Sequence, residues 1–592
     1  MTSRAPTDGV IARPPKRGWA GVALAVASIA CLLAINYYAN HGVLWLANGL
    51  NLAVVVELDG EPIKVDAESR RETWTSTGVH RVRILREDGT VIDEDAFVID
   101  HWGIYPLNVY NVSGAASIFL KNVEYSKRGA KPDQDQNVAD FSGGKRFLSV
   151  AHVAYPFETP PTSINSESYG TVIKKHAEWR PGGYKSTFGY LADRRSPAMV
   201  DLMGSLAKAL PDTTGAFAAF ALNGEPVVGT AAIAQWAAEQ KKQSPDNQVA
   251  HRAYQNAMIR MGRREDVTRE YQEAYEKGGK TPEDAILLAR LLPHAEALPL
   301  LTGALQTYPS NVSLHGRLGV IALHAREYEK AISHFALATT GRDYPELVEH
   351  HAAALLGLGK GDEAAGLLAR WAEVATIDAS VERMYALAVL ATPGSKLPPW
   401  RFVDRRAEKF GSADYKFWAR SLTAEPPSFK NISKDTAQVI GIHAGVFDSP
   451  KTAWKACNSA SPNLLRNVDS TVALLFAAEF VRIGDLTLAG LLFIGRQEFM
   501  FTLKDLEQYI HRGTEVPGFE WVGPSQRAAL EYVRYRALAA EGKLDGQLLA
   551  TAARRDVWKS LVSYAVKSWP SPQSQVPITT QGRGSGSKGS SK

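Results

Sequence analysis

The chain has 592 residues, of which 45% are hydrophobic and 22% charged, a balance typical of globular proteins and a length that allows several domains. Its net charge is only +5 and no basic patch is interleaved with aromatic residues, which argues against nucleic acid as a partner. Two cysteines, Cys31 and Cys457, exclude a scaffold held together by several disulfides.

The first feature along the chain is an uncharged apolar run from Trp19 to Ile35. As a helix it would extend about 26 Å, near the lower limit for crossing a hydrocarbon core. Basic residues precede the run at Arg4, Arg13, Lys16 and Arg17. Because positive flanks stay in the cytoplasm, we expect a cytoplasmic N-terminus over residues 1–17, a transmembrane helix over 18–39 and export of the rest.

Two alternatives share this layout. A cleaved signal peptide would be cut after the small residues of Ser28–Ile29–Ala30, which would leave an apolar stretch beyond the cut. Cys31 at the same place offers a lipid-attachment site, although Ser28 stands where such sites usually have Leu. We favour the uncleaved anchor, which places the chain in the inner (cytoplasmic) membrane as a single-pass protein with its bulk on the periplasmic side.

Residues 43–125 have the period-two alternation typical of strands. The runs VVVELDG (54–60) and HRVRILREDG (80–89) alternate apolar and polar residues and each ends in Asp-Gly. Asp-Gly between such runs favours a tight hairpin, because Gly takes positive φ at little cost. We therefore expect a small antiparallel β-sandwich here, with His80 on an exposed strand face.

Two segments of this region, LANGLNLAVVVELDGEPI (46–63) and STGVHRVRI (76–84) with its Gly-x-His-x-Val strand, resemble PEGA-type domains of bacterial surface proteins. The resemblance implies a role in the cell envelope without catalysis. Another possibility is contact with a cell-wall glycan, for which Trp45, Trp74 and Trp102 would supply stacking surfaces. We expect these tryptophans to be buried in the sandwich instead.

Residues 126–196 form a linker and a region without an assigned topology. A polar stretch, SKRGAKPDQDQ (126–136), precedes the predicted strand FLSVAHVAYPF (147–157). The region either completes the sandwich or connects it to helices. If the chain is an enzyme or an enzyme accessory, we expect the active site within residues 146–245.

Residues 198–569 show helical periodicity in repeated pairs. In the clearest unit, 312–343, Gly319 and Ala331 allow two helices to approach while Tyr328 and Phe335 fill the space between pairs. Corresponding close-packing positions recur at Val267, Ala297, Ala331 and Ala364, at steps of 30, 34 and 33 residues. This spacing resembles the tetratricopeptide repeat, which implies a right-handed stack of helix hairpins with a concave face.

The expected fold class is therefore α+β and multidomain. It comprises one transmembrane helix, a small antiparallel β-sandwich over 43–125, and an all-α, tetratricopeptide-like solenoid over 198–569. The Ser- and Gly-rich residues 570–592 are expected to form a disordered tail, and their QGRGSGSKGSSK sequence lacks the Gly-Lys-Ser/Thr of a phosphate-binding loop.

No catalytic, cofactor-binding or metal-binding residues are predicted. The sequence has no HExxH, no Cys-x-x-Cys and no nucleophile elbow. Five of the 14 histidines fall between His315 and His351, but their positions in the repeat do not converge on one point, as metal ligands must.

The resemblance to tetratricopeptide repeats also points to a partner site. Groove-facing positions of the first helices are Ser313, Val320, His324, Glu346 and Glu349. A neutral to acidic groove favours an apolar or basic peptide, although Glu346 and Glu349 are more typical of a solvated helix face. The leading hypothesis is a membrane-anchored scaffold that binds partner proteins or peptides and performs no catalysis.

Overall fold

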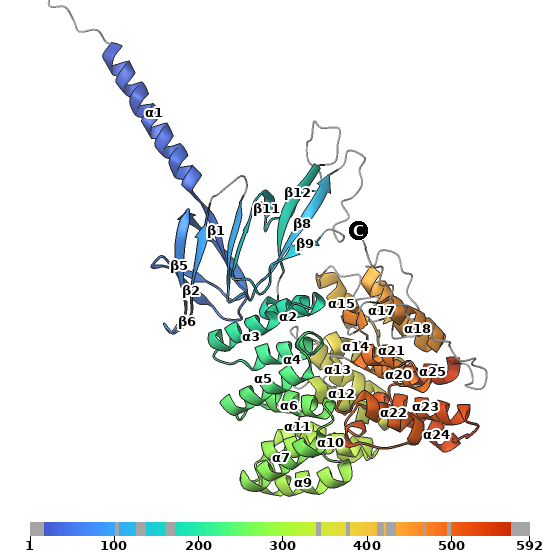
Figure 1. Cartoon of the computed structure of the whole chain (residues 1–592). Helices are drawn as coiled ribbons and strands as arrows, with labels where there is room; N and C mark the ends of the chain where they lie inside the picture. Colours follow the sequence, from blue (N-terminus) through green and yellow to red (C-terminus); the bar gives the residue numbers. More distant parts are fainter. Residues whose placement is uncertain are drawn as a thin grey trace, which may run out of the picture. The chain divides into compact units, whose positions relative to one another are not determined.

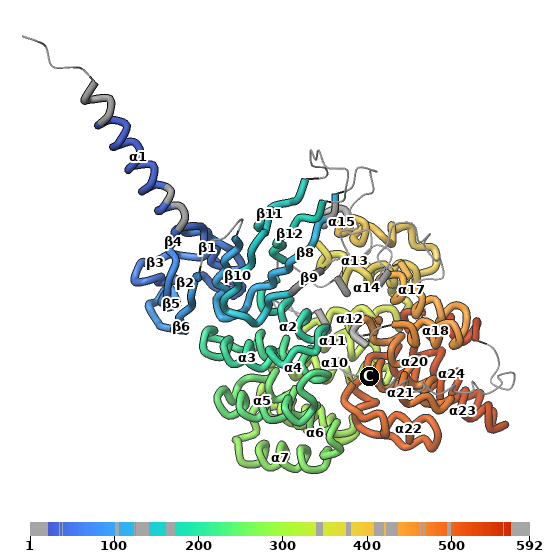
Figure 2. The backbone as a smooth tube through the Cα atoms, turned by 45° about the horizontal axis from the view of Figure 1, so that its top comes forward, coloured from blue at the N-terminus to red at the C-terminus, as the bar shows by residue number. Residues whose placement is uncertain are grey.

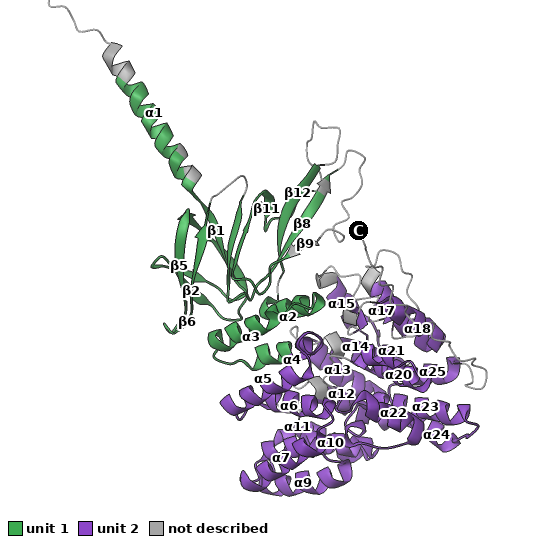
Figure 3. Cartoon of the chain, in the orientation of Figure 1, with its two compact units in different colours: residues 1–220 green, residues 221–592 purple. Residues whose placement is uncertain are grey.

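The computed structural model describes residues 17–100, 106–125, 138–161, 172–180, 182–338, 345–373, 379–410, 420–421, 434–460, 462–465, 468–493, 496, 499–559 and 561–569. They belong to two compact units, Met1–Phe220 and Ala221–Lys592 (Figure 3). The first unit is rich in β-strands and the second is helical. The predicted linker 126–136 and the predicted tail 570–592 lie outside the described residues.

The first unit begins with α1 (Arg17–Asn40), which leads directly into the first strand (Figure 1). Its described apolar side chains are exposed, among them Val22, Leu24 and Leu33. In the part of the chain that the structure describes, no helix combines the length and the apolarity needed to cross a membrane.

The described strands of the first unit form three four-stranded sheets. Their orders are β10-β7-β1-β4 (sheet A), β3-β2-β5-β6 (sheet B) and β11-β12-β8-β9 (sheet C). The strand bounds are β1 His41–Asn48, β2 Val54–Leu58, β3 Glu61–Val65, β4 Ser69–Ser76, β5 Gly78–Arg86, β6 Val91–Ile99, β7 Leu107–Val112, β8 Ser117–Tyr125, β9 Val138–Phe141, β10 Phe147–Val150, β11 Val153–Pro156 and β12 Val172–Arg180.

Both predicted hairpins are present in sheet B. Asp59 and Gly60 turn β2 into β3 with positive φ at each residue, and Gly89 takes positive φ between β5 and β6. The alternation in β2 buries Val54, Val56 and Leu58 on one face, as the sequence predicts. The local turn chemistry thus decides these two strand pairings.

Two findings bear on the predicted antiparallel sandwich: the sheets are not wholly antiparallel, and the described strands favour the alternative in which residues 126–196 complete the β-region. First, β1 pairs with β7 in parallel, and β11 pairs with β12 in parallel. Second, β9 to β12 complete sheets A and C, so the β-region continues to Arg180. Two parallel strands need a long connection, and the connection between β1 and β7 contains all of sheet B. The local alternation of apolar and polar residues could not reveal a pairing over this distance.

His80 is also placed differently from the prediction, because it points into the protein. Its Nδ1 lies 2.7 Å from Asp59 Oδ2 and its Nε2 lies 3.0 Å from the Ser76 carbonyl oxygen. The Arg81 backbone N–H donates to Asp59 Oδ1 at 2.9 Å. Burial alone would raise the pKa of Asp59, but these hydrogen bonds outweigh it and lower the pKa. His80 therefore ties the β2–β3 turn to β5.

Helices α2 (Gly183–Asp193) and α3 (Ala198–Ala209) complete the first unit. The Tyr184 N–H donates to the Gly49 carbonyl at 3.0 Å, and Thr187 Oγ1 donates to the Ala115 carbonyl at 2.8 Å. A Cβ on Gly183 would lie 2.4 Å from the Gly49 oxygen, so only glycine allows this approach. The boundary between the units falls within α4 (Thr214–Val228).

The second unit is an array of helices in which chain neighbours pack in pairs, such as α10 on α11 and α23 on α24 (Figure 2). The bounds are α5 Thr230–Gln243, α6 Gln248–Arg260, α7 Arg264–Lys277, α8 Pro282–Ala289, α9 His294–Thr307, α10 Val312–His324, α11 Tyr328–Ala338, α12 Pro345–Gly357, α13 Gly361–Glu373, α14 Ala379–Ala391, α15 Arg401–Phe410, α17 Lys434–Phe447, α18 Pro450–Ser459, α19 Pro462–Leu465, α20 Ser470–Arg482, α21 Leu486–Phe493, α22 Leu503–Arg512, α23 Pro524–Ala540, α24 Gly546–Arg555 and α25 Leu561–Ser568.

The α10–α11 pair has the packing that its sequence predicts. Ala331 and Phe335 are fully buried on α11. A Cβ added to Gly319 would lie between 2.7 and 3.0 Å from three atoms of the Phe335 ring, so the absent side chain permits the contact. Asn311 begins α10 by accepting from the backbone N–H groups of Ser313 and Leu314. This arrangement is consistent with a tetratricopeptide-like stack.

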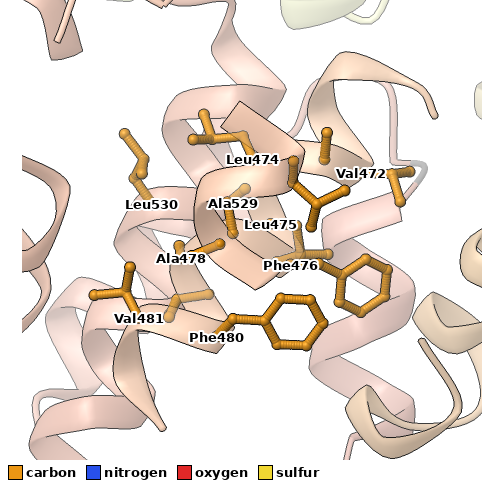
Figure 4. Close-up of a cluster of buried hydrophobic side chains, with 14 of the residues drawn as sticks. Val472, Leu474, Leu475, Phe476, Ala478, Phe480, Val481, Ala529 and Leu530 are labelled. Carbon is orange, nitrogen blue, oxygen red and sulfur yellow. The ribbon is translucent and has the colours of Figure 1, made fainter. Parts of the chain in front are cut away.

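The C-terminal part of the unit has its largest core between α17 and α25, and Figure 4 shows part of it, around α20 and α23. A charged group also lies inside this region. Glu479 is completely buried and its two carboxylate oxygens accept from Arg482 at 2.7 and 2.8 Å and from Arg536 at 3.2 and 3.3 Å. A buried carboxylate is tolerated here because two guanidinium groups compensate its charge.

Candidate partner-binding groove

The sequence-predicted groove residues lie on α10 and α12. Val320 and His324 are buried, and Ser313 in the first turn of α10 is half-buried. Glu349 on α12 is half-buried and has a partner within the protein, whereas the side chain of Glu346 lies outside the described residues. The contribution of all five to partner binding stays a prediction.

The C-terminal part of the chain packs against this same region. Trp521 donates from Nε1 to the Leu292 carbonyl at 3.1 Å, and its indole meets the His294 ring edge to face at 4.5 Å. Arg555 Nη1 donates to the His324 carbonyl at 3.1 Å. A partner could reach His324 only after these residues withdraw.

Other residues from the C-terminal part of the chain belong to hydrophobic clusters formed mainly by the N-terminal helices of the second unit. Met500 belongs to the cluster formed by α6, α7 and α8, and Trp558 to the one that includes α10 to α14. Arg264 Nη2 also donates to the Met500 carbonyl at 2.8 Å. Segments 236 residues apart in sequence are therefore in direct contact within the second unit.

A small hollow remains beside His324. Its lining residues are Leu323, His324, Arg326, Tyr328, Pro524, Arg555 and Val557. The hollow thus lies between the end of α10 and the C-terminal helices. Two arginines, Arg326 and Arg555, line the hollow, and none of the described lining residues is acidic.

The half-buried His294 and the buried His324, both near the hollow, are neutral at pH 7. Burial, assisted by the charges of Arg527 and Arg555, lowers the pKa of His294 to about 4. Burial and the neighbouring His294 hold the pKa of His324 well below its usual value. The Nε2 atoms of both rings are buried without a hydrogen-bond partner among the described residues. Their rings lie 5.5 Å apart, centroid to centroid.

The charges behind these histidines compensate one another. Glu531 Oε1 lies 2.9 Å from Arg555 Nε and 3.3 Å from Arg527 Nε. Burial nevertheless raises the pKa of Glu531, against the effect of both arginines. Since Arg527 also pairs with Glu515 at 2.7 Å, the region is a compensated ionic cluster that stabilises contact between α23 and α24.

Among the histidines between His315 and His351, the structure brings one pair into contact through ring nitrogen atoms. His315 Nδ1 and His334 Nδ1 lie 3.0 Å apart, and His315 Nε2 lies 3.0 Å from the Pro309 carbonyl. His315 must donate to that carbonyl, so its Nδ1 accepts from His334. Over the described residues, no group of three or more His, Cys, Asp or Glu side chains is placed to hold a metal ion.

A serine, a histidine and an aspartate meet elsewhere in the helical unit. Ser421 Oγ lies 2.8 Å from His443 Nδ1, and the Asp469 backbone N–H donates to His443 Nε2 at 3.2 Å. The Asp469 carboxylate instead accepts from the first N–H groups of α20 and pairs with Arg383 at 2.9 Å. His443 therefore donates to the serine, the reverse of what a general base must do.

The stretch 146–245, where an active site was the alternative expectation, contains β10 to β12 and α2 to α5. Its polar contacts join elements of the fold. Arg180 Nη1 donates to the Tyr190 hydroxyl at 3.1 Å, Arg180 Nε lies 2.9 Å from Glu178 Oε1, and Lys121 pairs with Glu178. These contacts connect β8, β12 and α2, and the enzyme hypothesis stays untested.

The three tryptophans proposed for glycan stacking have different environments. Trp45 is half-buried and meets the Phe157 ring edge to face at 5.1 Å. Trp74 is exposed, so the expectation that it is buried is wrong. Trp102 lies outside the described residues.

No known protein family matches the sequence, and none of the curated proteins compared with it is similar. The PEGA-like and tetratricopeptide resemblances therefore rest on the quoted residues alone.

Sequence reasoning missed the segment 517–524, whose Trp521 contacts His294 and whose Pro524 lies beside His324. Its sequence, PGFEWVGP, is bounded by Pro and Gly and holds two aromatic residues. Gly518 makes its close approach possible, since a Cβ there would lie 2.1 Å from the Met500 carbonyl oxygen. An aromatic cluster between helix breakers is the one available signal of an ordered segment.

Proposed function

We propose that this chain is a membrane-anchored scaffold whose helical unit binds partner proteins or peptides outside the cytoplasm and that it performs no catalysis. The observation that carries the proposal is the paired packing of α5 to α25, with a Gly319–Phe335 contact typical of repeats that bind other proteins. Stacked helix pairs form extended surfaces on which other proteins can bind.

The anchor is supported by the composition and exposure of α1. Leu24, Leu32 and Leu33 are each more than half exposed. Residues 19–21 and 35 of the apolar run lie outside the side chains that the structure describes. The basic residues before the run favour a cytoplasmic N-terminus in the inner membrane and a periplasmic location for both units.

The partner surface that we propose is the accessible part of the groove around Ser313 and Glu349. Val320 and His324 are buried, and they would join it only if Arg555 and the segment 517–524 withdrew. An apolar or basic peptide fits this surface best, because Glu349 and the neighbouring α12 residues supply no positive charge.

The test is site-specific photo-crosslinking in intact cells. A photoreactive residue replaces Ser313 or Glu349, and a matched one replaces Glu329, an exposed residue on α11. We expect defined adducts from the two groove positions and none from Glu329. Identical patterns from all three positions, or no adducts from any, would exclude a binding groove at this place.

Topology is tested separately by protease digestion of intact and permeabilised spheroplasts. Both units should be cut without permeabilisation of the inner membrane. Protection of the helical unit until the inner membrane is opened would reverse the proposed orientation.

A further inference from the structure

One end of the β-region is fixed to the end of α1. The helix ends at Asn40 and β1 begins at His41, so no linker separates them. The Thr77 N–H donates to the Asn40 carbonyl at 2.8 Å, and the Tyr37 and His41 rings stack at 4.0 Å. The turn between β4 and β5 is therefore held beside the last turn of α1.

Three large apolar side chains are exposed at this end of the strands. Trp74 is 57% exposed, Val79 70% and Val98 49%. Trp74 pairs with Val43, the third residue after Asn40, and Val79 pairs directly with Val98 and is the second residue after Thr77. At about 3.3 Å per strand residue, Trp74 and Val79 both lie within roughly 10 Å of the helix end.

The polarity of the strands changes along their length. The stretches 73–79 (TWTSTGV) and 96–99 (AFVI), next to α1, carry no charge. Farther along the same strands, Arg83 pairs with Glu57 at 3.4 Å and with Glu94 at 3.2 Å. Two of the exposed apolar residues on β5 and β6, Val79 and Val98, thus lie at the end that α1 approaches, whereas Val91 lies at the other end.

The length of α1 places this end at a defined depth. The apolar run ends at Ile35, and five more helical residues up to Asn40 rise about 7.5 Å. One headgroup layer of a bilayer is about 5 to 8 Å thick. If the run fills the hydrocarbon core, the first strand begins at the outer limit of the headgroups.

We propose that Trp74, Val79 and Val98 form a second membrane contact, which lies against the outer surface of the headgroup layer of the leaflet at the C-terminal end of α1. The inference rests on the proposed membrane anchor and adds a surface that fixes the orientation of the β-region. Tryptophan favours this layer because its ring is apolar and its N–H is polar. A glycan would instead require hydrogen-bonding groups around the stacked ring, and the two valines supply none.

The experiment uses the full chain reconstituted in vesicles of phosphatidylethanolamine and phosphatidylglycerol. In a Cys31→Ser background, where Cys457 is buried, Val79→Cys or Val98→Cys carries an environment-sensitive fluorophore. The matched control is Val91→Cys, an exposed position on β6 at the opposite end of the same hairpin. Lipids with a quencher at headgroup depth are expected to lower the fluorescence of labels 79 and 98 about two-fold and leave label 91 unchanged.

Flotation of the vesicles separates the two levels of the proposal. If the chain floats but labels 79 and 98 behave like label 91, the second contact is wrong and the anchor stands. If the chain does not float, the anchor itself is wrong. If labels 79 and 98 respond only to added cell-wall fragments, the surface binds glycan and the membrane contact is excluded.

Discussion

Gly319 offers the sharpest test of how the helix pairs pack. An alanine Cβ at this position would lie 2.7 to 3.0 Å from three atoms of the Phe335 ring, which is completely buried. Gly303 on α9 is the matched control, since a Cβ there meets nothing within 4 Å. Both glycines lie within helices, so the intrinsic gain in helix propensity is the same for both substitutions.

The magnitudes follow from two opposing effects. Replacing a helical Gly by Ala stabilises a helix by about 1 kcal/mol. Forcing a methyl group into a well-packed contact costs about 1 to 3 kcal/mol. Gly303→Ala should therefore stabilise the helical unit by up to about 1 kcal/mol, whereas Gly319→Ala should destabilise it by about 0 to 2 kcal/mol.

Pulse proteolysis in urea measures the population of unfolded helical unit for each variant of the full chain. A double variant, Gly319→Ala with Phe335→Leu, provides the check on mechanism, because the smaller side chain leaves room for the methyl group. We expect the cost of Gly319→Ala to shrink in that background. The reasoning is refuted if Gly319→Ala stabilises the unit as much as Gly303→Ala does.

Three further perturbations test polar contacts. Glu479→Ala leaves two buried guanidinium groups uncompensated and should cost about 3 to 5 kcal/mol, measured by pulse proteolysis. His443, whose pKa burial lowers to about 4, is neutral in the folded protein while the unfolded chain takes up a proton below pH 6.5. Stability should therefore fall, by up to about 3 kcal/mol, as the pH drops from 6.5 to 4, and less so in His443→Gln. Asp59→Gly keeps the positive φ of the turn but removes the acceptor of His80, at a cost of about 1 to 2 kcal/mol seen as faster hydrogen exchange in β2 and β5.

The first two of these have a discriminating control. Glu541→Ala removes a carboxylate that pairs with Lys543 at an exposed site and should leave the urea midpoint unchanged. A Glu479→Ala effect no larger than that of Glu541→Ala would mean that the buried arginines find other partners. For His443, an equal loss of stability on acidification in the His443→Gln variant would assign the pH dependence to other groups.

Features that depend on neighbouring residues could be predicted from the sequence. The Asp-Gly turns between alternating runs predict the two hairpins of sheet B, because each turn determines the register of the strands beside it. The small residue Gly319 predicts the close approach of α10 and α11, because positions on paired helices are set by their periodicity, whereas Phe335, expected between pairs, lies against Gly319 within the pair. The apolar run before His41 predicts a long helix, and the structure has one.

Features that depend on distant residues were decided only by the tertiary structure. The parallel pairing of β1 with β7 joins segments separated by all of sheet B. His80 is buried because Asp59, 21 residues away, supplies an acceptor, and His324 is covered because Arg555, 231 residues away, packs over it. The sequence carries the periodicity that forms each element, whereas the choice of which faces meet is made by the burial of apolar surface contributed by the whole unit.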